Sequence, residues 1–141
     1  MKESSKVKFQ HVSVATIGTA LYKRGLRHQV IQGAGPVGWK GANMVGPAFT
    51  LRYMPAREDR NGIEVFRHPK HKQRVAIETC PEGHVLVMDS RKQADAASAG
   101  DILLTRLMKR GAAGVVTDGG FRDAMNIAQL DMPAYHTRPS S

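Results

Sequence analysis

The fold of this chain is constrained most by residues 98–123, which read SAGDILLTRLMKRGAAGVVTDGGFRD. Four apolar side chains in this stretch fall at i, i+1, i+4 and i+5: Leu103, Leu104, Leu107 and Met108. That spacing places them on one face of a helix. Residues 113–117 follow as a short apolar run, which is typical of a buried parallel strand fed by a helix. The stretch therefore predicts a helix-strand unit of an α/β domain.

Charged and small residues mark the ends of this unit. Asp101 lies in the first turn of the expected helix, where a carboxylate suits the helix dipole, and Gly111 can end the helix. Arg122 and Asp123 follow the expected strand after a turn at residues 118–120. Ligands of α/β domains gather at the carboxyl ends of strands and at helix N-termini. We therefore expect a functional site at these ends.

The rest of the chain predicts an alternation of strands and helices. We expect helices at residues 13–24, 72–79 and 124–130, and strands at 28–32, 44–54, 84–89 and 132–136. Residues 33–41 and 58–72 are expected to be loops, and residues 91–100 either a loop or a short helix. Pro47 suggests an edge position or a bulge for its strand. The pattern from residue 84 onward is that of a single α/β domain spanning residues 1–141.

Composition and net charge indicate the cellular compartment and the kinds of binding partner to expect. The single Cys80 rules out an internal disulfide, and no apolar stretch is long enough for a membrane span or a signal peptide. We therefore expect a cytoplasmic protein that does not bind membranes. The net charge is +9, and basic residues are densest at residues 52–74. Without a recognisable motif this charge favours a solvated loop over a nucleic-acid interface, and an anionic substrate or an acidic partner stays possible.

Other motifs have simpler explanations. The run from Gly33 to Gly38 matches G-x-G-x-x-G, with Glu58 twenty residues further on, but nearby prolines and glycines disfavour the helix that a dinucleotide site needs. The histidines at 68, 71 and 84 lack the spacing of a zinc site. Cys80 has no sequence partner that would make it a nucleophile.

Asp101, Arg122 and Asp123 together support a specific chemistry. Free N–H groups at Asp101, Ile102 and Leu103 can hold a substrate carboxylate, and Arg122 can hold or polarise a keto oxygen. Asp123 offers a hard oxygen ligand, which suits Mg²⁺ or Mn²⁺. Such a site can stabilise an enolate next to a carboxylate.

The run GDILLTRLMKRGAAGVVTDGGFRD resembles the signature of the RraA-like family, which includes class II 4-hydroxy-4-methyl-2-oxoglutarate aldolases and regulators of ribonuclease activity. The aldolase branch carries D-x20-R-D, matched by Asp101, Arg122 and Asp123. The segments VSVATIGTALYKRGLRHQVIQG and MVGPAFTLRYMPARED are similar to the N-terminal half of the family. The resemblance implies a swivelling β/β/α-type domain with a mixed sheet and flanking helices.

The resemblance also implies roles for individual residues. Gly100, Asp101, Ile102 and Leu103 would bind the pyruvate moiety through backbone N–H groups, and Arg122 would contact its keto and carboxylate oxygens. Asp123 would anchor Mg²⁺ or Mn²⁺, and Asp101 would orient a water on the metal. The implied reaction is retro-aldol cleavage or decarboxylation of a small 2-oxo acid to give pyruvate, with Asp101 and Arg122 as catalytic residues.

Two functions follow from this resemblance. The ribonuclease-regulator branch typically lacks the final Asp, so Asp123 favours an aldolase or oxaloacetate decarboxylase over a non-catalytic regulator that binds a ribonuclease. Members form homotrimers or hexamers with active sites between subunits. They also continue past the position of Ser141, so we expect a domain that is incomplete at its C-terminus.

Overall fold

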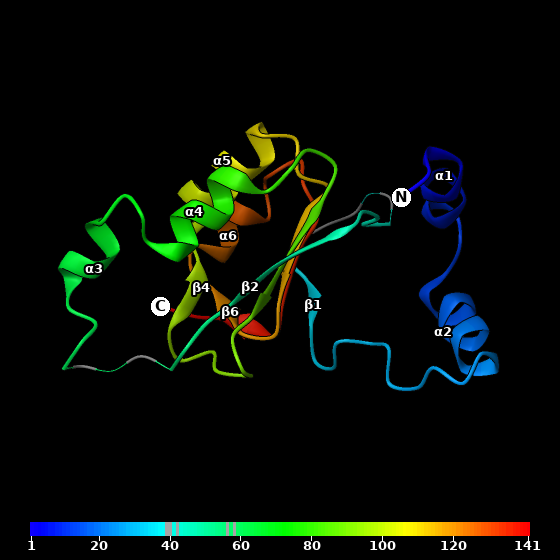
Figure 1. Ribbon diagram of the computed structural model, residues 1–141, viewed down its shortest axis with the longest axis horizontal. Coiled ribbons are helices and arrows are strands. Elements are labelled where there is room, and N and C mark those ends of the chain that lie inside the picture. The colour runs from blue at the N-terminus through cyan, green and yellow to red at the C-terminus, as the bar shows by residue number, and fades with distance from the viewer. Residues whose placement is uncertain (39–40, 42, 56, 58) are drawn as a thin grey trace.

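The computed structural model describes residues 1–38, 41, 43–55, 57 and 59–141, and places two β-sheets next to a layer of helices (Figure 1). The larger sheet has the strand order β1-β7-β5-β3-β2. Its strands are β1 (Gly35–Pro36), β2 (Ala48–Arg52), β3 (Val85–Asp89), β5 (Gly114–Thr117) and β7 (Ala134–His136). Neighbouring strands are parallel except β1 and β7, so the sheet is mixed.

The smaller sheet consists of three short parallel strands, β4 (Ala97–Ala99), β6 (Gly120–Phe121) and β8 (Arg138–Pro139). Each of them follows a strand of the larger sheet, because β4 comes after β3, β6 after β5, and β8 after β7. The chain therefore passes from the larger to the smaller sheet three times. Helix α5 (Asp101–Lys109) begins directly after β4, and α6 (Ala124–Ile127) begins soon after β6.

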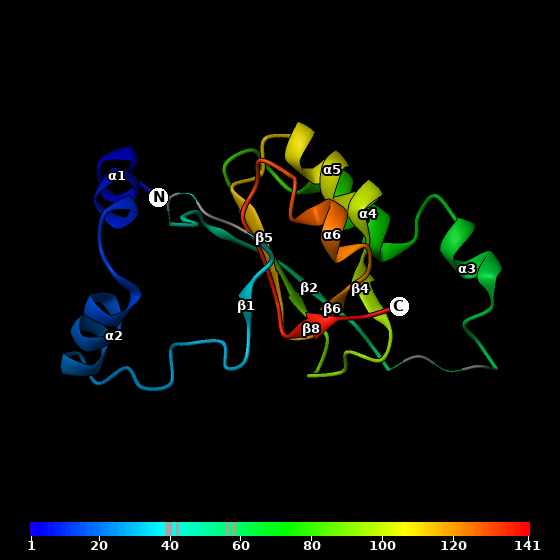
Figure 2. The ribbon, with the colours of Figure 1, turned by 180° about the vertical axis from the view of Figure 1, so that it is seen from behind.

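Helices α4 (Lys72–Thr79), α5 and α6 lie side by side against the larger sheet, as both views show (Figures 1 and 2). The core joins apolar side chains of these helices to those of the central strands: Ile77, Leu104, Leu107, Ile127, Leu86, Met88 and Val115. Each fully buried side chain of this size contributes about 1.5–3 kcal/mol. The apolar stripe expected at residues 103–108 is thus the face of α5 that packs on the sheet.

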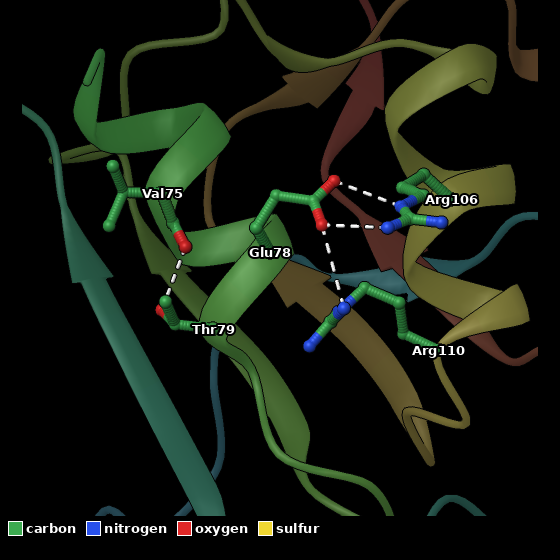
Figure 3. Close-up of polar contacts among 5 residues, drawn as sticks. All are labelled: Val75, Glu78, Thr79, Arg106 and Arg110. Atoms are coloured by element: carbon green, nitrogen blue, oxygen red, sulfur yellow. Dashed lines mark hydrogen bonds and ion pairs between the residues drawn. The ribbon is translucent and has the colours of Figure 1, made fainter. Parts of the chain in front are cut away.

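Glu78 links α4 to α5 at the surface (Figure 3). Its Oε1 accepts a hydrogen bond from Nε of Arg106 at 2.9 Å, and its Oε2 accepts from Nη2 at 2.8 Å. Arg110 adds a longer contact to Oε2 at 3.5 Å. The hydrogen bond from Arg106 lowers the pKa of the Glu78 carboxyl, because it favours the ionised form.

Helices α1 (Glu3–Gln10) and α2 (Val14–Lys23) extend from one end of the molecule, and α3 (Ile63–Arg67) extends from the other (Figures 1 and 2). Ser13 caps α2, since its Oγ accepts the N–H of Thr16 at 3.1 Å. Neither α1 nor α2 has a buried residue. Among the described residues, no helix combines the length and apolar character needed to cross a bilayer.

Most elements expected from the pattern are confirmed. The helix predicted at residues 72–79 is α4, the strands predicted at 84–89 and 113–117 contain β3 and β5, and β2 follows Pro47 at the edge of the larger sheet. The mixed α/β architecture with flanking helices is therefore the expected one.

Four local predictions are wrong. The loop predicted at residues 33–41 contains β1, which pairs with β7. Residues 28–32 are irregular, and Val30 and Ile31 are about half exposed; among the described residues, no strand pairs with this segment. The loop predicted at residues 58–72 contains α3, and the loop predicted at 91–100 contains β4. Strand β4 consists of small residues and forms because β6 pairs with it, a contact that is distant in sequence.

Candidate active site

Gly100 and Asp101 form the start of α5, directly after β4. Gly100 is the N-cap, with extended backbone angles of −124° and 179°. Oδ1 of Asp101 accepts the N–H of Ile102 at 2.7 Å, and Oδ2 accepts the side-chain amide of Asn126 at 2.7 Å. Both carboxylate oxygens of Asp101 are therefore engaged, and its side chain has a defined orientation between α5 and α6.

Arg122 and Asp123 come directly after β6, the strand that pairs with β4. The N–H of Arg122 donates to the carbonyl of Ala99 at 3.1 Å, which fixes the start of this segment beside the end of β4. Asp123 has a left-handed backbone, with φ of 57° and ψ of 35°, and precedes α6. Nε of Arg122 lies 3.5 Å from Oδ2 of Asp123, and both side chains are accessible to solvent.

Gly100 brings the two halves of the site together. A Cβ atom at this position would lie 2.8 Å from Nε of Arg122 and 2.8 Å from Oδ2 of Asp123. The two side chains therefore lie directly against the backbone at the N-terminus of α5. The structure thus brings together Gly100, Asp101, Arg122 and Asp123, which the sequence places on two separate segments.

The helix N-terminus offers fewer free donors than the sequence suggests. The N–H of Ile102 already donates to Oδ1 of Asp101. Within the described contacts, the N–H groups of Asp101 and Leu103 have no protein acceptor. The side chain of Ile102 is 78% exposed, whereas Leu103 packs against the core and anchors the helix.

Sequence reasoning missed the groups that support this site. Asn126 is one, because a polar residue in a short helix gives no indication of its partner until α5 and α6 are placed together. Ser98 is the second, since it lies in β4 and its carbonyl accepts hydrogen bonds from Tyr53 and Gln73, both at 2.6 Å. Burial raises the pKa of the Tyr53 phenol to about 12, so it remains a hydrogen-bond donor near neutral pH.

Three buried hydroxyls join the two sheets below the site. Oγ of Ser90 and Oγ of Ser98 are 2.7 Å apart, and Oγ1 of Thr117 lies 3.1 Å and 2.9 Å from them. Thr117 also accepts the N–H of Gly119 at 3.0 Å. Because Ser90 follows β3, Ser98 belongs to β4 and Thr117 ends β5, these bonds fix the small sheet on the large one.

The donor set fits a hard divalent cation held with water. Asp123 offers a carboxylate, and Mg²⁺ is commonly bound by one or two carboxylates with water completing its shell. In the part of the chain that the structure describes, no three His, Cys, Asp or Glu side chains cluster to form a metal site.

The other sequence motifs lie apart from this site. Residues Gly35–Pro36 of the glycine-rich run form β1, at the opposite edge of the larger sheet from β2. Glu58, the acidic residue expected after that run, lies outside the described residues. Cys80 is buried, and burial raises the pKa of its thiol, which disfavours the thiolate.

Fold and site together define an α/β domain whose polar groups converge at a strand end and a helix N-terminus. The sequence model of the RraA-like family, described as Aldolase/RraA, matches residues 14–140. The chain belongs to this family.

Solved structures agree with this assignment. RraAS2 of Streptomyces coelicolor, described as an unusual member of the RNase ES inhibitor RraA protein family, is similar with a TM-score of 0.80 and 29% identity. The match covers 99% of this chain and 65% of that chain.

Two further structures share the fold. An uncharacterized protein of Pseudomonas syringae has a TM-score of 0.77 at 23% identity, over 99% of this chain and 60% of its own. The RNA-processing inhibitor RraA of Thermus thermophilis has a TM-score of 0.62 at 21% identity, and the match covers 87% of this chain and 67% of that chain. This chain therefore spans 60% and 65% of the length of two of these relatives.

Proposed function

We propose that this chain carries the catalytic segment of a divalent-metal-dependent carbon–carbon lyase that releases pyruvate from small 2-oxo acids. The observation that supports this most directly is the position of Arg122 and Asp123 against Gly100 at the N-terminus of α5. A guanidinium, a carboxylate and two backbone N–H groups without a described protein acceptor lie close together there. This is the donor set that a 2-oxo acid and a hard cation require.

In this proposal each residue of the site has a separate role. Arg122 donates its N–H groups to the keto and carboxylate oxygens of the substrate, and the N–H groups of Asp101 and Leu103 hold the same carboxylate. Asp101, oriented by Asn126, holds a water that can deliver a proton. Cleavage breaks the C3–C4 bond of the 2-oxo acid, and the electron pair left on C3 takes a proton to give pyruvate. The C4 fragment leaves as CO2 from oxaloacetate, or as a second pyruvate from 4-hydroxy-4-methyl-2-oxoglutarate once its C4 hydroxyl has given up its proton.

Asp123 would hold Mg²⁺ or Mn²⁺. A cation at that position stabilises the negative charge that develops on the keto oxygen as the bond at C3 breaks. The role of Asp123 is to fix the position of this charge relative to Arg122, and the 3.5 Å between Nε and Oδ2 keeps both groups at the same site.

The test is pyruvate release from oxaloacetate and from 4-hydroxy-4-methyl-2-oxoglutarate, with Mg²⁺, with Mn²⁺ and with EDTA. We expect metal-dependent release that falls by about 100-fold or more in Asp123→Asn, within the range seen when one charge-stabilising group is removed. Asp131→Asn is the matched control, because this exposed carboxylate lies outside the site. Release that survives EDTA, or falls equally in both variants, would contradict the proposal.

A second function has its own support. RraAS2, at 29% identity, is described as belonging to a family of ribonuclease inhibitors. The alternative is a non-catalytic regulator that binds a ribonuclease. The discriminating measurement is inhibition of an RNase E-type enzyme by the chain with and without EDTA. Inhibition that is independent of metal and intact in Asp123→Asn, with no pyruvate release, would favour the regulator.

We further propose that residues 1–141 fold as one RraA-like domain that assembles as a homotrimer or hexamer. Family members typically oligomerise, and this chain exposes apolar side chains on α2 and in the segment after it, among them Val14, Tyr22, Leu26 and Val30. Light scattering of the purified chain tests this proposal, and a monomer at all accessible concentrations would overturn it.

A further inference from the structure

The basic residues between Arg52 and Arg74 divide into two groups in the structure. Arg52 pairs with Asp89 at 2.6 Å. Arg57 and Arg60 both contact Asp59, at 2.6 Å and 3.8 Å. Each arginine of this first group therefore has a carboxylate partner within the chain.

The second group lies at residues 67–74, which read RHPKHKQR and contain no acidic residue. Its four cations are Arg67, Lys70, Lys72 and Arg74, and all four are exposed. Within the described part of the chain, none of them takes part in an ion pair. These cations have no anionic partner among the residues that the structure describes.

The placement of two of these cations is unfavourable for the isolated fold. Lys72 and Arg74 lie in the first turn of α4, and that turn contains no acidic residue. Positive charge there opposes the helix dipole. The folded chain thus concentrates positive charge where its own electrostatics disfavour it, and proteins break such local rules mainly at functional sites.

An aromatic residue directly precedes these cations in the sequence. Phe66, the residue before Arg67, is 46% exposed. Its ring contacts the His71 ring with centroids 5.2 Å apart and planes tilted by 49°. One side of Phe66 is thus supported by the chain, and much of the ring remains accessible. Helix α3, which contains Phe66, extends outward from the body of the molecule, so a long ligand can approach it (Figures 1 and 2).

We propose that residues 66–74, the cationic segment, bind single-stranded nucleic acid. Phosphates would contact the four cations, and a base would stack on Phe66. Proteins bind single strands through this combination of a cationic track and aromatic platforms. An acidic peptide would use the cations but has no bases to stack on the ring. The net charge of +9 attracts either polyanion from a distance, so it does not distinguish them.

The test measures fluorescence anisotropy of a labelled 16-nucleotide oligouridylate against the full chain at several salt concentrations. The variant Arg67→Gln/Lys70→Gln/Lys72→Gln/Arg74→Gln removes the four cations. We expect it to weaken binding at low salt at least tenfold and to reduce the slope of log K against log salt by about 3, because each phosphate contact contributes about 0.7 for single strands. Phe66→Ala should weaken binding about tenfold with little change in slope.

The matched control changes the same amount of charge elsewhere. Lys2, Lys8, Lys23 and Lys109 are exposed, and no ion pair of the described residues includes them. Replacing these four lysines by Gln should weaken binding less than about threefold. Circular dichroism establishes that every variant is folded.

Three results would overturn the proposal. The first is equal weakening by both four-site variants, which would indicate non-specific attraction. The second is competition by polyglutamate as strong as that by oligouridylate, with Phe66→Ala unaffected, which would indicate an acidic protein partner. The third is no binding by the unaltered chain at low salt.

Discussion

The side-chain amide of Asn126 donates to Oδ2 of Asp101 at 2.7 Å and joins the first turn of α5 to α6. Since Oδ1 of the same carboxylate accepts the N–H of Ile102, both oxygens are held before any ligand binds. A group oriented in advance loses little freedom on binding, and this is how a supporting residue assists a catalytic one. Asn126 is therefore a positioning residue in the proposed mechanism.

Replacing Asn126 should affect turnover more than binding. Asn126→Asp keeps the shape but replaces the donor by a second carboxylate, so we expect kcat for pyruvate release to fall about 10- to 100-fold with a smaller change in KM. Steady-state kinetics provide the measurement, and Gln129→Ala, at an exposed position after α6, is the control. A drop in kcat matched by loss of the folded state would instead assign Asn126 a structural role.

Gly100→Ala tests the close approach at the helix start. The added Cβ would meet Nε of Arg122 and Oδ2 of Asp123, both at 2.8 Å, whereas the backbone angles of Gly100 suit any residue. The ends of both side chains can move, so we expect stability to change by less than about 1 kcal/mol while activity falls about tenfold or more.

The control for this substitution is Gly18→Ala in α2, where a Cβ meets nothing within 4 Å. That change should raise stability by up to about 1 kcal/mol, because Ala favours the helix, and should leave activity unchanged. Full activity in Gly100→Ala would mean that the site tolerates displacement of Arg122 and Asp123.

Thr117→Val tests the hydroxyl cluster between the sheets. The variant keeps the volume of the side chain but removes Oγ1, which contacts Ser90 and Ser98 and accepts the N–H of Gly119. Because Thr117 is 1% exposed, the buried partner left unpaired should reduce the free energy of unfolding by about 1–3 kcal/mol. Urea denaturation measures this, and Thr50→Val, at an exposed position of β2, should change it by less than about 0.5 kcal/mol.

Glu78→Gln should give a stability difference that depends on pH. Arg106 holds the pKa of Glu78 in the folded chain below its value in the unfolded chain. The stabilising contribution is therefore present above the unfolded pKa and disappears as pH falls through the folded pKa. We expect a small decrease in Tm relative to the unaltered chain at about pH 7, shrinking toward zero at about pH 3, and weaker at high salt. An equal difference at both pH values would contradict this account.

The elements that the sequence predicted are those with a strong local pattern. Helix α5 was predictable because its apolar residues recur at helical period, and β5 because it is a short apolar run between a glycine-ended helix and a glycine turn. Strands β4, β6 and β8 are two or three residues long and contain Ala, Gly and Pro. Their formation depends on pairing across the sheet, which local composition does not encode.

The candidate site was predicted through the spacing of Asp101, Arg122 and Asp123. Their convergence could be expected because they follow two strands that pair side by side. The engagement of the Ile102 N–H and the role of Asn126 could not, since both depend on the side-chain orientation of Asp101. The sequence also did not show that the cationic segment has no ion-pair partner among the described residues, because only three-dimensional contacts distinguish it from Arg52, Arg57 and Arg60.

The chain passes from the larger sheet to the smaller sheet three times, and this affects how the molecule unfolds. Neither sheet is made of one continuous part of the chain, because each strand of the smaller sheet comes after a strand of the larger one in the sequence. Unfolding of one sheet would release the chain segments that position the strands of the other sheet. Neither sheet of this α/β body is therefore a separate folding unit. The body should therefore lose its structure in one cooperative transition, and the side chains of the candidate site would lose their arrangement at the same time as the core unfolds.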